Sequence, residues 1–216
     1  MSKSDLQLKT DIEEELRWDP MINEAAVGVT VKNGKVSLMG TVDTYAEKWA
    51  AEDATRRVSG VRGVTQDLKV ALRAEHARSD ADLKSAIDAA LKWNVFVPTT
   101  ITAKVTDGAV TLEGSVGWNY QRDFAERSIR YLSGVNSVTN LVELKPVPTT
   151  AVVKDKVAAA LKRQAITDAA SIKIETSGTK VTLSGHASSW QSIEDATQAA
   201  WAAPGVNEVV EHIAIQ

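Results

Sequence analysis

Leu38-Met39-Gly40, continued after a helical stretch by Gly60-Val61-Arg62-Gly63-Val64, is the pattern that decides the fold, because the chain contains it three times. The second copy is Leu112-Glu113-Gly114 with Gly134-Val135-Asn136-Ser137-Val138. The third is Leu183-Ser184-Gly185 with Gly205-Val206-Asn207-Glu208-Val209. The two glycines of each copy are 20 positions apart (40 to 60, 114 to 134, 185 to 205). Repetition at a constant spacing indicates one structural unit copied along the chain.

The repeat divides the 216 residues into three predicted units, at residues 4–72, 79–145 and 149–216. Units of about 70 residues bury a modest share of their surface and are only marginally stable alone. We therefore expect contacts between the three units to stabilise each of them. The linker 73–79 is short and polar, whereas Lys145-Pro146-Val147-Pro148 is stiff and extended.

Each unit begins with an amphipathic helix, since apolar residues recur every four positions. In the first unit the row of apolar residues follows Ser4, which is predicted to cap the helix together with Gln7. This helix is predicted to end near Asp19-Pro20. The second stripe follows Ser79 and the third follows Thr150. The stripes are Leu8, Ile12 and Leu16; Leu83, Ile87 and Leu91; and Val153, Val157 and Leu161.

A β-hairpin follows, because valines alternate with polar residues on both sides of a turn signal. The predicted turns are Asn33-Gly34, Asp107-Gly108 and Ser177-Gly178. A second helix then begins after Thr44 with Glu47, and after Ser188 with Gln191 in the third copy. The last strand contains Leu68, Val70 and Leu72 in the first unit. Each unit is thus predicted as α-β-β-α-β, an α+β unit with a three-stranded mixed sheet and two helices on one face.

The recurring glycines are predicted to be structural. Gly40, Gly114 and Gly185 are expected to close the hairpins. Gly60, Gly134 and Gly205 are expected to end the second helices in the left-handed conformation that glycine adopts readily.

Composition excludes several classes of function. The net charge is −3 and no unit is basic, which argues against nucleic acid binding and against a polybasic membrane anchor. The absence of cysteine excludes disulfides, thiolate metal sites and cysteine nucleophiles. No window approaches the length of an apolar bilayer span. The polar amino terminus carries no export signal, so a cytoplasmic location is expected.

The order hairpin, Leu-x-Gly, helix, Gly-Val-x-x-Val, strand resembles the BON domain, the bacterial osmotic-stress and nodulation module, three times over. The resemblance implies α-β-β-α-β units used in tandem, no catalysis and roles in binding. It also implies relatives that are osmotic-shock proteins, lipoproteins recognising anionic phospholipid, or a potassium-binding protein.

No catalytic, cofactor or metal site is predicted from the residues. Gly28-Val29-Thr30-Val31-Lys32-Asn33-Gly34-Lys35 approximates a phosphate loop, but Val36 occupies the position of the magnesium-binding hydroxyl, and the segment alternates as a hairpin does. His76, His186 and His212 lack neighbouring ligands, and no nucleophile elbow is present. A potassium site made of backbone carbonyls would leave no sequence motif.

Six tryptophans are the candidate contact residues. Two of them occupy matching places at the ends of the first helices, and four are assigned to the second helices: Trp18, Trp93, Trp49, Trp118, Trp190 and Trp201. They either fill gaps inside and between units or anchor a contact surface, where tryptophan is enriched.

Two functional hypotheses follow. The first is a non-enzymatic stress-response protein that binds a protein partner, a cation or, less favoured, phospholipid. The second is a structural protein that self-associates through the faces of its units.

Overall fold

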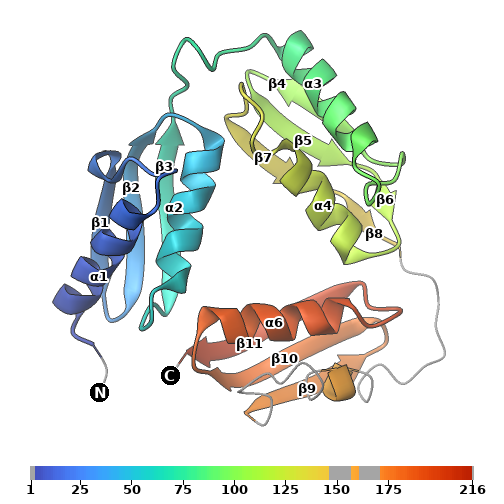
Figure 1. Ribbon diagram of the computed structural model, residues 1–216. Helices are drawn as coiled ribbons and strands as arrows, with labels where there is room; N and C mark the ends of the chain where they lie inside the picture. Colours follow the sequence, from blue (N-terminus) through green and yellow to red (C-terminus); the bar gives the residue numbers. More distant parts are fainter. Residues whose placement is uncertain (1–2, 146–156, 161–170, 216) are drawn as a thin grey trace.

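The computed structural model describes residues 3–145, 157–160 and 171–215, which form three units joined in sequence (Figure 1). The elements of the first unit are α1 (Asp5–Trp18), the short 3-10 helix η1 (Glu24–Ala26), β1 (Val27–Lys32), β2 (Lys35–Val42), α2 (Tyr45–Arg57) and β3 (Gly63–Val70).

The hairpin, the inner helix and the last strand recur in this order in the second and third units. The second contains α3 (Asp80–Trp93), β4 (Thr102–Thr106), β5 (Ala109–Glu113), β6 (Ser115–Val116), α4 (Asn119–Ile129), β7 (Ser137–Asn140) and β8 (Glu143–Leu144). The third contains β9 (Ile172–Ser177), β10 (Lys180–Ala187), α6 (Trp190–Trp201) and β11 (Glu208–Ile215).

Each sheet is mixed, as predicted. The hairpin strands pair antiparallel, and the last strand joins the second hairpin strand in parallel: β1-β2-β3, β4-β5-β7 and β9-β10-β11. In the second unit the long strands are interrupted, so that β6 and β8 form a separate parallel pair. The α+β fold in repeated units is confirmed.

The core of each unit lies between the sheet and its helices. Leu8, Ile12 and Leu16 of α1 are buried against β-strand valines and the alanines of α2. Leu83, Ile87 and Leu91 of α3 are buried in the same way. Of the third predicted stripe, only Val157 is described, and it is fully buried, whereas Val153 and Leu161 lie outside the described residues. Four-residue spacing therefore identified the buried helix faces.

Three predicted helix starts are confirmed and one is shifted. The hydroxyl of Ser79 accepts a hydrogen bond from the Asp82 N–H. The hydroxyl of Ser4 accepts a hydrogen bond from the Gln7 N–H, and that of Thr44 from the Glu47 N–H. The start predicted at Ser188 is wrong by one residue, because Ser189 accepts from the Ser192 N–H. The cap predicted at Thr150 lies outside the described residues.

The turns of the first two units are the predicted ones, with positive φ at Asn33 and Gly34 and at Asp107 and Gly108. The third turn is different from the prediction, since Ser177 pairs with Lys180 and the two turn residues are Gly178 and Thr179. Only Gly178 has positive φ there, at 61°. A glycine at the first turn position suits a type II′ turn and leaves the serine extended in the strand.

The first glycine of each repeat lies within or directly after the second hairpin strand and does not close the hairpin. Gly40 pairs with Val27 in the middle of the sheet and has φ of 136°. A Cβ atom on Gly40 would lie 2.1 Å from the carbonyl oxygen of Ala26. A Cβ atom on Gly114 would lie 2.2 Å from the Thr100 carbonyl oxygen, and one on Gly185 would lie 2.1 Å from that of Ser171. The repeat therefore conserves a close backbone approach between two strands.

The second glycine of each repeat has positive φ, but it lies beyond the helix end. Gly60 follows the C-cap residue Val58 of α2 by two positions, and Gly134 and Gly205 are further from the ends of α4 and α6. These glycines therefore shape the turn into the last strand.

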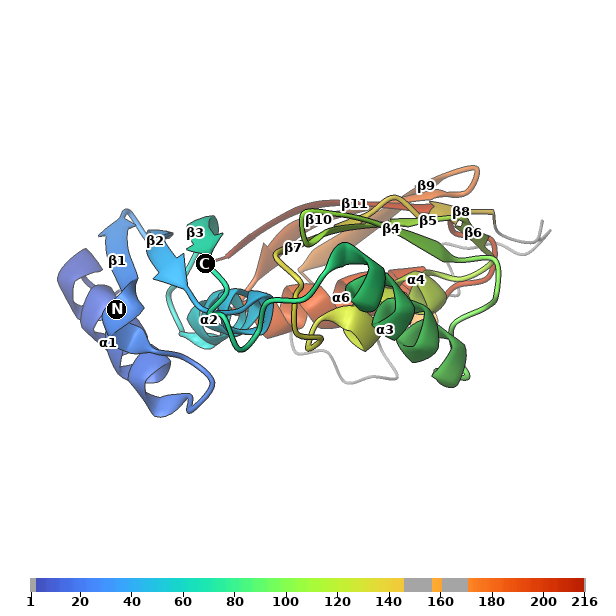
Figure 2. The same cartoon turned by 90° about the horizontal axis from the view of Figure 1, so that it is seen from above.

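The three units surround a common centre, with α2, α4 and α6 nearest to it (Figure 1). Seen from above, the helices of the second and third units lie on the same side of their sheets (Figure 2).

Candidate functional site

The inner helices follow one another head to tail around the centre of the molecule (Figure 1). Arg56 in the last turn of α2 contacts Trp190, the first residue of α6. Trp201 at the end of α6 contacts Arg122 in the first turns of α4. The ring closes where α4 ends and α2 begins. Three corners thus join the three units, one at each helix-to-helix junction.

An arginine lies over an indole ring at every corner. The guanidinium carbon of Arg130 is 3.9 Å from the ring centroid of Trp49, that of Arg56 is 5.3 Å from Trp190, and that of Arg122 is 5.5 Å from Trp201. These are cation–π distances. Each pair links two different units, so Trp49, Trp190 and Trp201 lie at the seams between units.

The corners use matching positions of the repeat. Arg56, Arg130 and Trp201 each stand four residues before the second signature glycine (56 and 60, 130 and 134, 201 and 205). Tyr45, Asn119 and Trp190 are the first residues of the three inner helices. Tyr45 packs against the core of the second unit and Trp190 against the core of the first. One partner at each corner therefore occupies the same repeat position, whereas the other partner, Trp190, Arg122 or Trp49, lies at a different position in the first turns of its helix.

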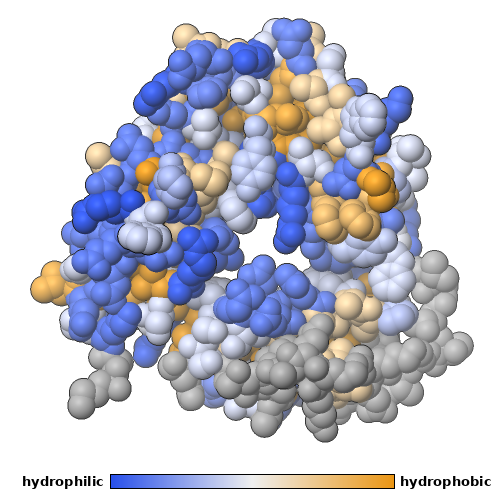
Figure 3. Space-filling model, viewed as in Figure 1, coloured by the Kyte–Doolittle hydropathy of each residue, from blue (hydrophilic) through white to orange (hydrophobic). Residues whose placement is uncertain are grey.

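A cavity of about 910 Å³ lies between the three inner helices. In the space-filling view it is a hollow at the centre of the molecule with hydrophilic side chains around it (Figure 3). The walls contain five arginines and six carboxylates, namely Arg56, Arg57, Arg122, Arg127 and Arg130 with Glu52, Asp53, Asp123, Glu126, Glu194 and Glu211. The cavity is polar and its charges are nearly balanced.

Three buried polar atoms on this wall have no hydrogen-bond partner: Asn119 Oδ1, Arg130 Nε and Trp190 Nε1. Asn119 is 7% exposed and Arg130 is 8% exposed. Unpaired buried donors and acceptors are costly, so groups of this kind are commonly satisfied by water or a ligand.

Two titratable groups of the cavity wall have altered pKa values. Burial raises the pKa of the Asp123 carboxyl, and the nearby Arg122 and Arg127 oppose that effect. Burial also raises the pKa of the Tyr45 phenol, with a further contribution from Glu126. Both groups are therefore biased toward their neutral forms.

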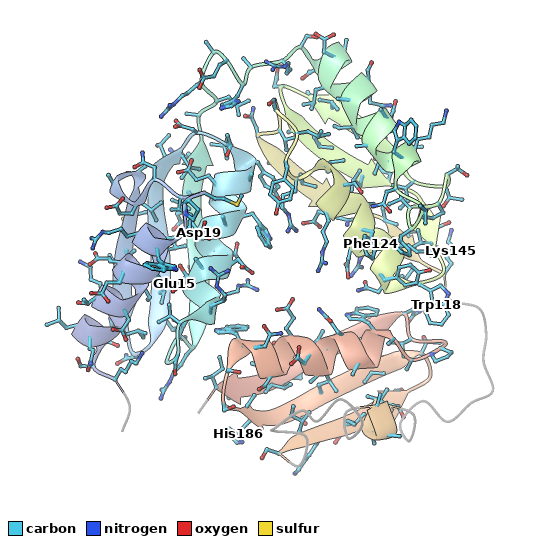
Figure 4. The ribbon with its side chains drawn as sticks, viewed as in Figure 1. Glu15, Asp19, Trp118, Phe124, Lys145 and His186 are labelled. Carbon is cyan, nitrogen blue, oxygen red and sulfur yellow. The ribbon has the colours of Figure 1, made fainter. Side chains whose placement is uncertain are left out.

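The other tryptophans lie away from the seams. Trp18 and Trp93, the last residues of α1 and α3, are both 86% exposed. Trp118 is 38% exposed and is the N-cap residue of α4, not a helical residue as predicted. Figure 4 shows Trp118 and Phe124 at the same end of the second unit.

The second unit also carries a cluster of three aromatic rings, which we call the aromatic triad: Phe96, Tyr120 and Phe124. Phe96 stacks on Phe124 with centroids 4.7 Å apart, and Tyr120 meets both rings edge-on at 6.4 Å. Phe96 and Tyr120 are about half exposed. Trp93 and Val95, which precede Phe96 by three positions and one, are almost fully exposed. We name Trp93, Val95 and the triad together the aromatic surface.

Neither the arginines nor the triad is predicted from the sequence. The arginines could have been found by aligning the repeats on their glycines, which places Arg56, Arg130 and Trp201 in register. The triad had a compositional signal, since both phenylalanines of the chain fall in the second unit.

Within the described residues no group of three or more histidine or acidic side chains is arranged to hold a metal ion. None of the described helices is long and apolar enough to cross a membrane.

Comparison with solved structures finds weak similarity to a structural protein of the type III secretion system of Chlamydia trachomatis. CdsD matches with 16% identity and a TM-score of 0.25, covering 94% of this chain and 90% of that chain. Its C-terminal domain matches with 16% identity and a TM-score of 0.27, covering 99% and 100%.

Comparison with curated proteins finds Osmotically-inducible protein Y of Escherichia coli strain K12, which is 32% identical over 133 residues. The match covers 57% of this chain and 64% of that protein, so it spans less than two thirds of the relative. The profile of the BON domain matches residues 4–71, 79–146 and 149–216. Since these three matches cover nearly the whole chain, the protein belongs to the BON domain family.

Proposed function

We propose that this chain is a binding protein of the bacterial osmotic or general stress response that engages a protein partner through the aromatic surface of its second unit. The observation that carries the proposal is the half-exposed, mutually packed aromatic triad beside Trp93 and Val95. The similarity to an osmotically inducible protein supports the stress role, and membership of the BON family supports a function without catalysis.

The geometry of the triad suits a binding anchor. Its rings hold one another in place, so little side-chain freedom is lost when a partner covers them. Exposed aromatic side chains also provide a large apolar area, and tryptophan and tyrosine dominate the binding energy of many interfaces. The first unit has the matching Trp18 but no aromatic ring at the places of Tyr120 and Phe124, where Ala46 and Ala50 stand instead. The surface is therefore specific to one unit.

The charges around the surface favour a protein over an anionic membrane. The helix α3 carries three aspartates and two lysines, and α4 carries two arginines with one aspartate and one glutamate. Attraction to anionic lipid grows with each basic residue near the bilayer, and this surface has no basic excess.

Photo-crosslinking tests the proposal with a matched control. A photo-reactive amino acid is placed at position 93 in one variant and at position 18 in another, because Trp93 and Trp18 are equally exposed at equivalent helix ends. In osmotically stressed cells, position 93 should give a discrete protein adduct, and position 18 should not. Phe96→Ser with Tyr120→Ser should abolish the adduct. Equal adducts from both positions, or none, would refute the proposal.

The membrane alternative is separated by flotation with anionic vesicles. Flotation of the wild type that is lost in the Phe96→Ser and Tyr120→Ser variant would assign the aromatic surface to lipid instead.

A second candidate function is self-association as a structural protein. Two exposed tryptophans at equivalent ends of α1 and α3 favour it, because such side chains could pair between chains. Light scattering at rising concentration should then show a mass that depends on Trp18 and Trp93. A constant monomer mass removes this candidate.

A further inference from the structure

Two of the five arginines on the cavity wall form no ion pair among the described residues. Glu52 pairs with Arg56, Asp53 with Arg57, and Glu126 with Arg130. After these pairs are set aside, Arg122 and Arg127 remain without a carboxylate partner among the described residues. Each guanidinium carries five N–H groups. The inner side of α4 therefore offers ten N–H groups from two arginines that form no ion pair among the described residues, although the Asp123 carboxyl lies near both.

Two more donors are buried in the same wall without an acceptor. They are Arg130 Nε, on a side chain that is 8% exposed, and Trp190 Nε1. Arg130 is held in the wall, since Trp49 lies against its guanidinium and the Glu126 carboxylate forms an ion pair with it at 3.5 Å. These buried donors come from two different units, so only a group inside the cavity could serve them together.

We propose that the cavity binds a small soluble anion with more than one oxyanion group, carboxylate or phosphate. Arg122 and Arg127, five positions apart on α4, would each hold an oxyanion, because the planar guanidinium pairs with carboxylate and phosphate oxygens through two parallel N–H groups. Arg130 Nε and Trp190 Nε1 provide donors at other points of the wall, which suits a ligand with separated acceptors. The volume of about 910 Å³ falls in the range of small-molecule sites.

Three carboxylates remain on the wall once the ion pairs are set aside, namely Asp123, Glu194 and Glu211, and they set a limit on the ligand. Asp123 lies between the two unpaired arginines in the sequence of α4 and accepts a hydrogen bond from the Asn119 side chain. Its carboxyl repels an anion whenever it is ionised. The choice of anion therefore depends on where the hydrogen-bond donors lie and not on the net charge of the cavity. Removing the charge of Asp123 should strengthen anion binding.

Calorimetric titration of the full chain at low ionic strength tests the site with two probes, inorganic pyrophosphate and citrate. Saturable binding of at least one probe is expected, with a preference that tells phosphate from carboxylate chemistry. Arg122→Gln and Arg127→Gln should each weaken it by about tenfold or more, the effect expected when a charged hydrogen-bonding group is removed. Asp123→Asn should tighten binding. Arg62→Gln, which changes an exposed arginine outside the cavity, should leave it unchanged.

Three results would overturn the proposal. They are no saturable binding of either probe, equal loss in Arg62→Gln and Arg122→Gln, or unchanged binding in Arg122→Gln. Thermal melting of each variant without probe shows that the chain is folded, so a loss of binding is not a loss of structure. Vesicles with anionic headgroups form a separate test, since the proposed ligand is a small soluble anion and the site lies between the three inner helices. Competition of pyrophosphate with such vesicles would also contradict the proposed site.

Discussion

The guanidinium carbon of Arg130, at the end of α4, lies 3.9 Å from the centroid of the Trp49 ring in α2. The side chain of Arg130 is nearly buried, and it is also within ion-pair distance of Glu126. This is the closest of the three arginine–indole contacts, and it joins the first unit to the second. Because a desolvated cation–π contact is worth about 2 kcal/mol, it is large against the stability of a unit of this size.

A double-mutant cycle between Arg130 and Trp49 should reveal this coupling. Arg130→Met keeps most of the apolar length of the side chain, and Trp49→Leu keeps an apolar residue in the seam. We expect a coupling free energy of about 1–2 kcal/mol from chemical denaturation. Small-angle scattering should show a larger radius of gyration for each single variant.

Trp18→Leu provides the control cycle with Arg130→Met, since Trp18 is exposed at the end of α1. Additivity within about 0.5 kcal/mol is expected for that pair. The same additivity for Arg130 and Trp49 would show that the contact does not couple the units.

Gly114→Ala should destabilise the second unit strongly, because its Cβ would lie 2.2 Å from the Thr100 carbonyl oxygen and its φ is 131°. A loss of more than about 2 kcal/mol is expected from the strain and the displaced strand. Gly117→Ala is the matched control, only three residues away, where an added Cβ meets nothing within 4 Å. Its effect should stay within about 0.5 kcal/mol. Similar melting temperatures for the two variants would contradict the steric explanation.

The repeat predicted the order of elements because periodicity reports which side chains are buried. Four-residue spacing in α1 and α3 and two-residue alternation in β1 and β2 depend only on local geometry and a common core. The position of Gly40 inside a strand could not be read in this way. Its constraint is a carbonyl of Ala26 on the neighbouring strand, and no local pattern encodes that contact.

The candidate site was predicted less well, because it depends on how the units meet. The sequence does not distinguish a tryptophan at a seam between units, such as Trp49, from one exposed to solvent, such as Trp93. The turn of the third unit was placed one residue early for a related reason, since Ser-Gly and Gly-Thr both read as turns. The position of the turn is set by the strand register, which pairs Ser177 with Lys180.

Asp80→Ala should loosen the hairpin of the second unit. The carboxylate of Asp80, in the first turn of α3, accepts hydrogen bonds from the N–H groups of Asp107 and Gly108 at 2.8 and 3.0 Å. Asp5 does the same for Asn33 and Gly34 in the first unit. Charge-assisted bonds of this kind contribute about 1.5–3 kcal/mol, toward the low end where they are partly exposed. Denaturation should therefore show a loss of about 1–2 kcal/mol.

Asp88→Ala is the control for that measurement, because Asp88 forms an ion pair with Lys84 on the surface of α3. Such pairs contribute little, at most about 0.5 kcal/mol. Equal losses for the two variants would mean that the turn contact of Asp80 does not stabilise the hairpin.

The Asp123 carboxyl should make stability depend on pH. Burial raises its pKa in the folded chain above the ordinary value of 3.8. The folded state therefore holds the proton more tightly than the unfolded state, and this contribution to stability is complete below the unfolded pKa. It is lost as the pH rises through the folded pKa, where a partly buried charge must form. Asp123→Asn should consequently melt at a higher temperature than the wild type at neutral pH. The difference should shrink as the pH falls toward 4 and the wild-type carboxyl takes up its proton. A melting difference that stayed constant between pH 7 and pH 4 would show that burial of the Asp123 charge is not its cause.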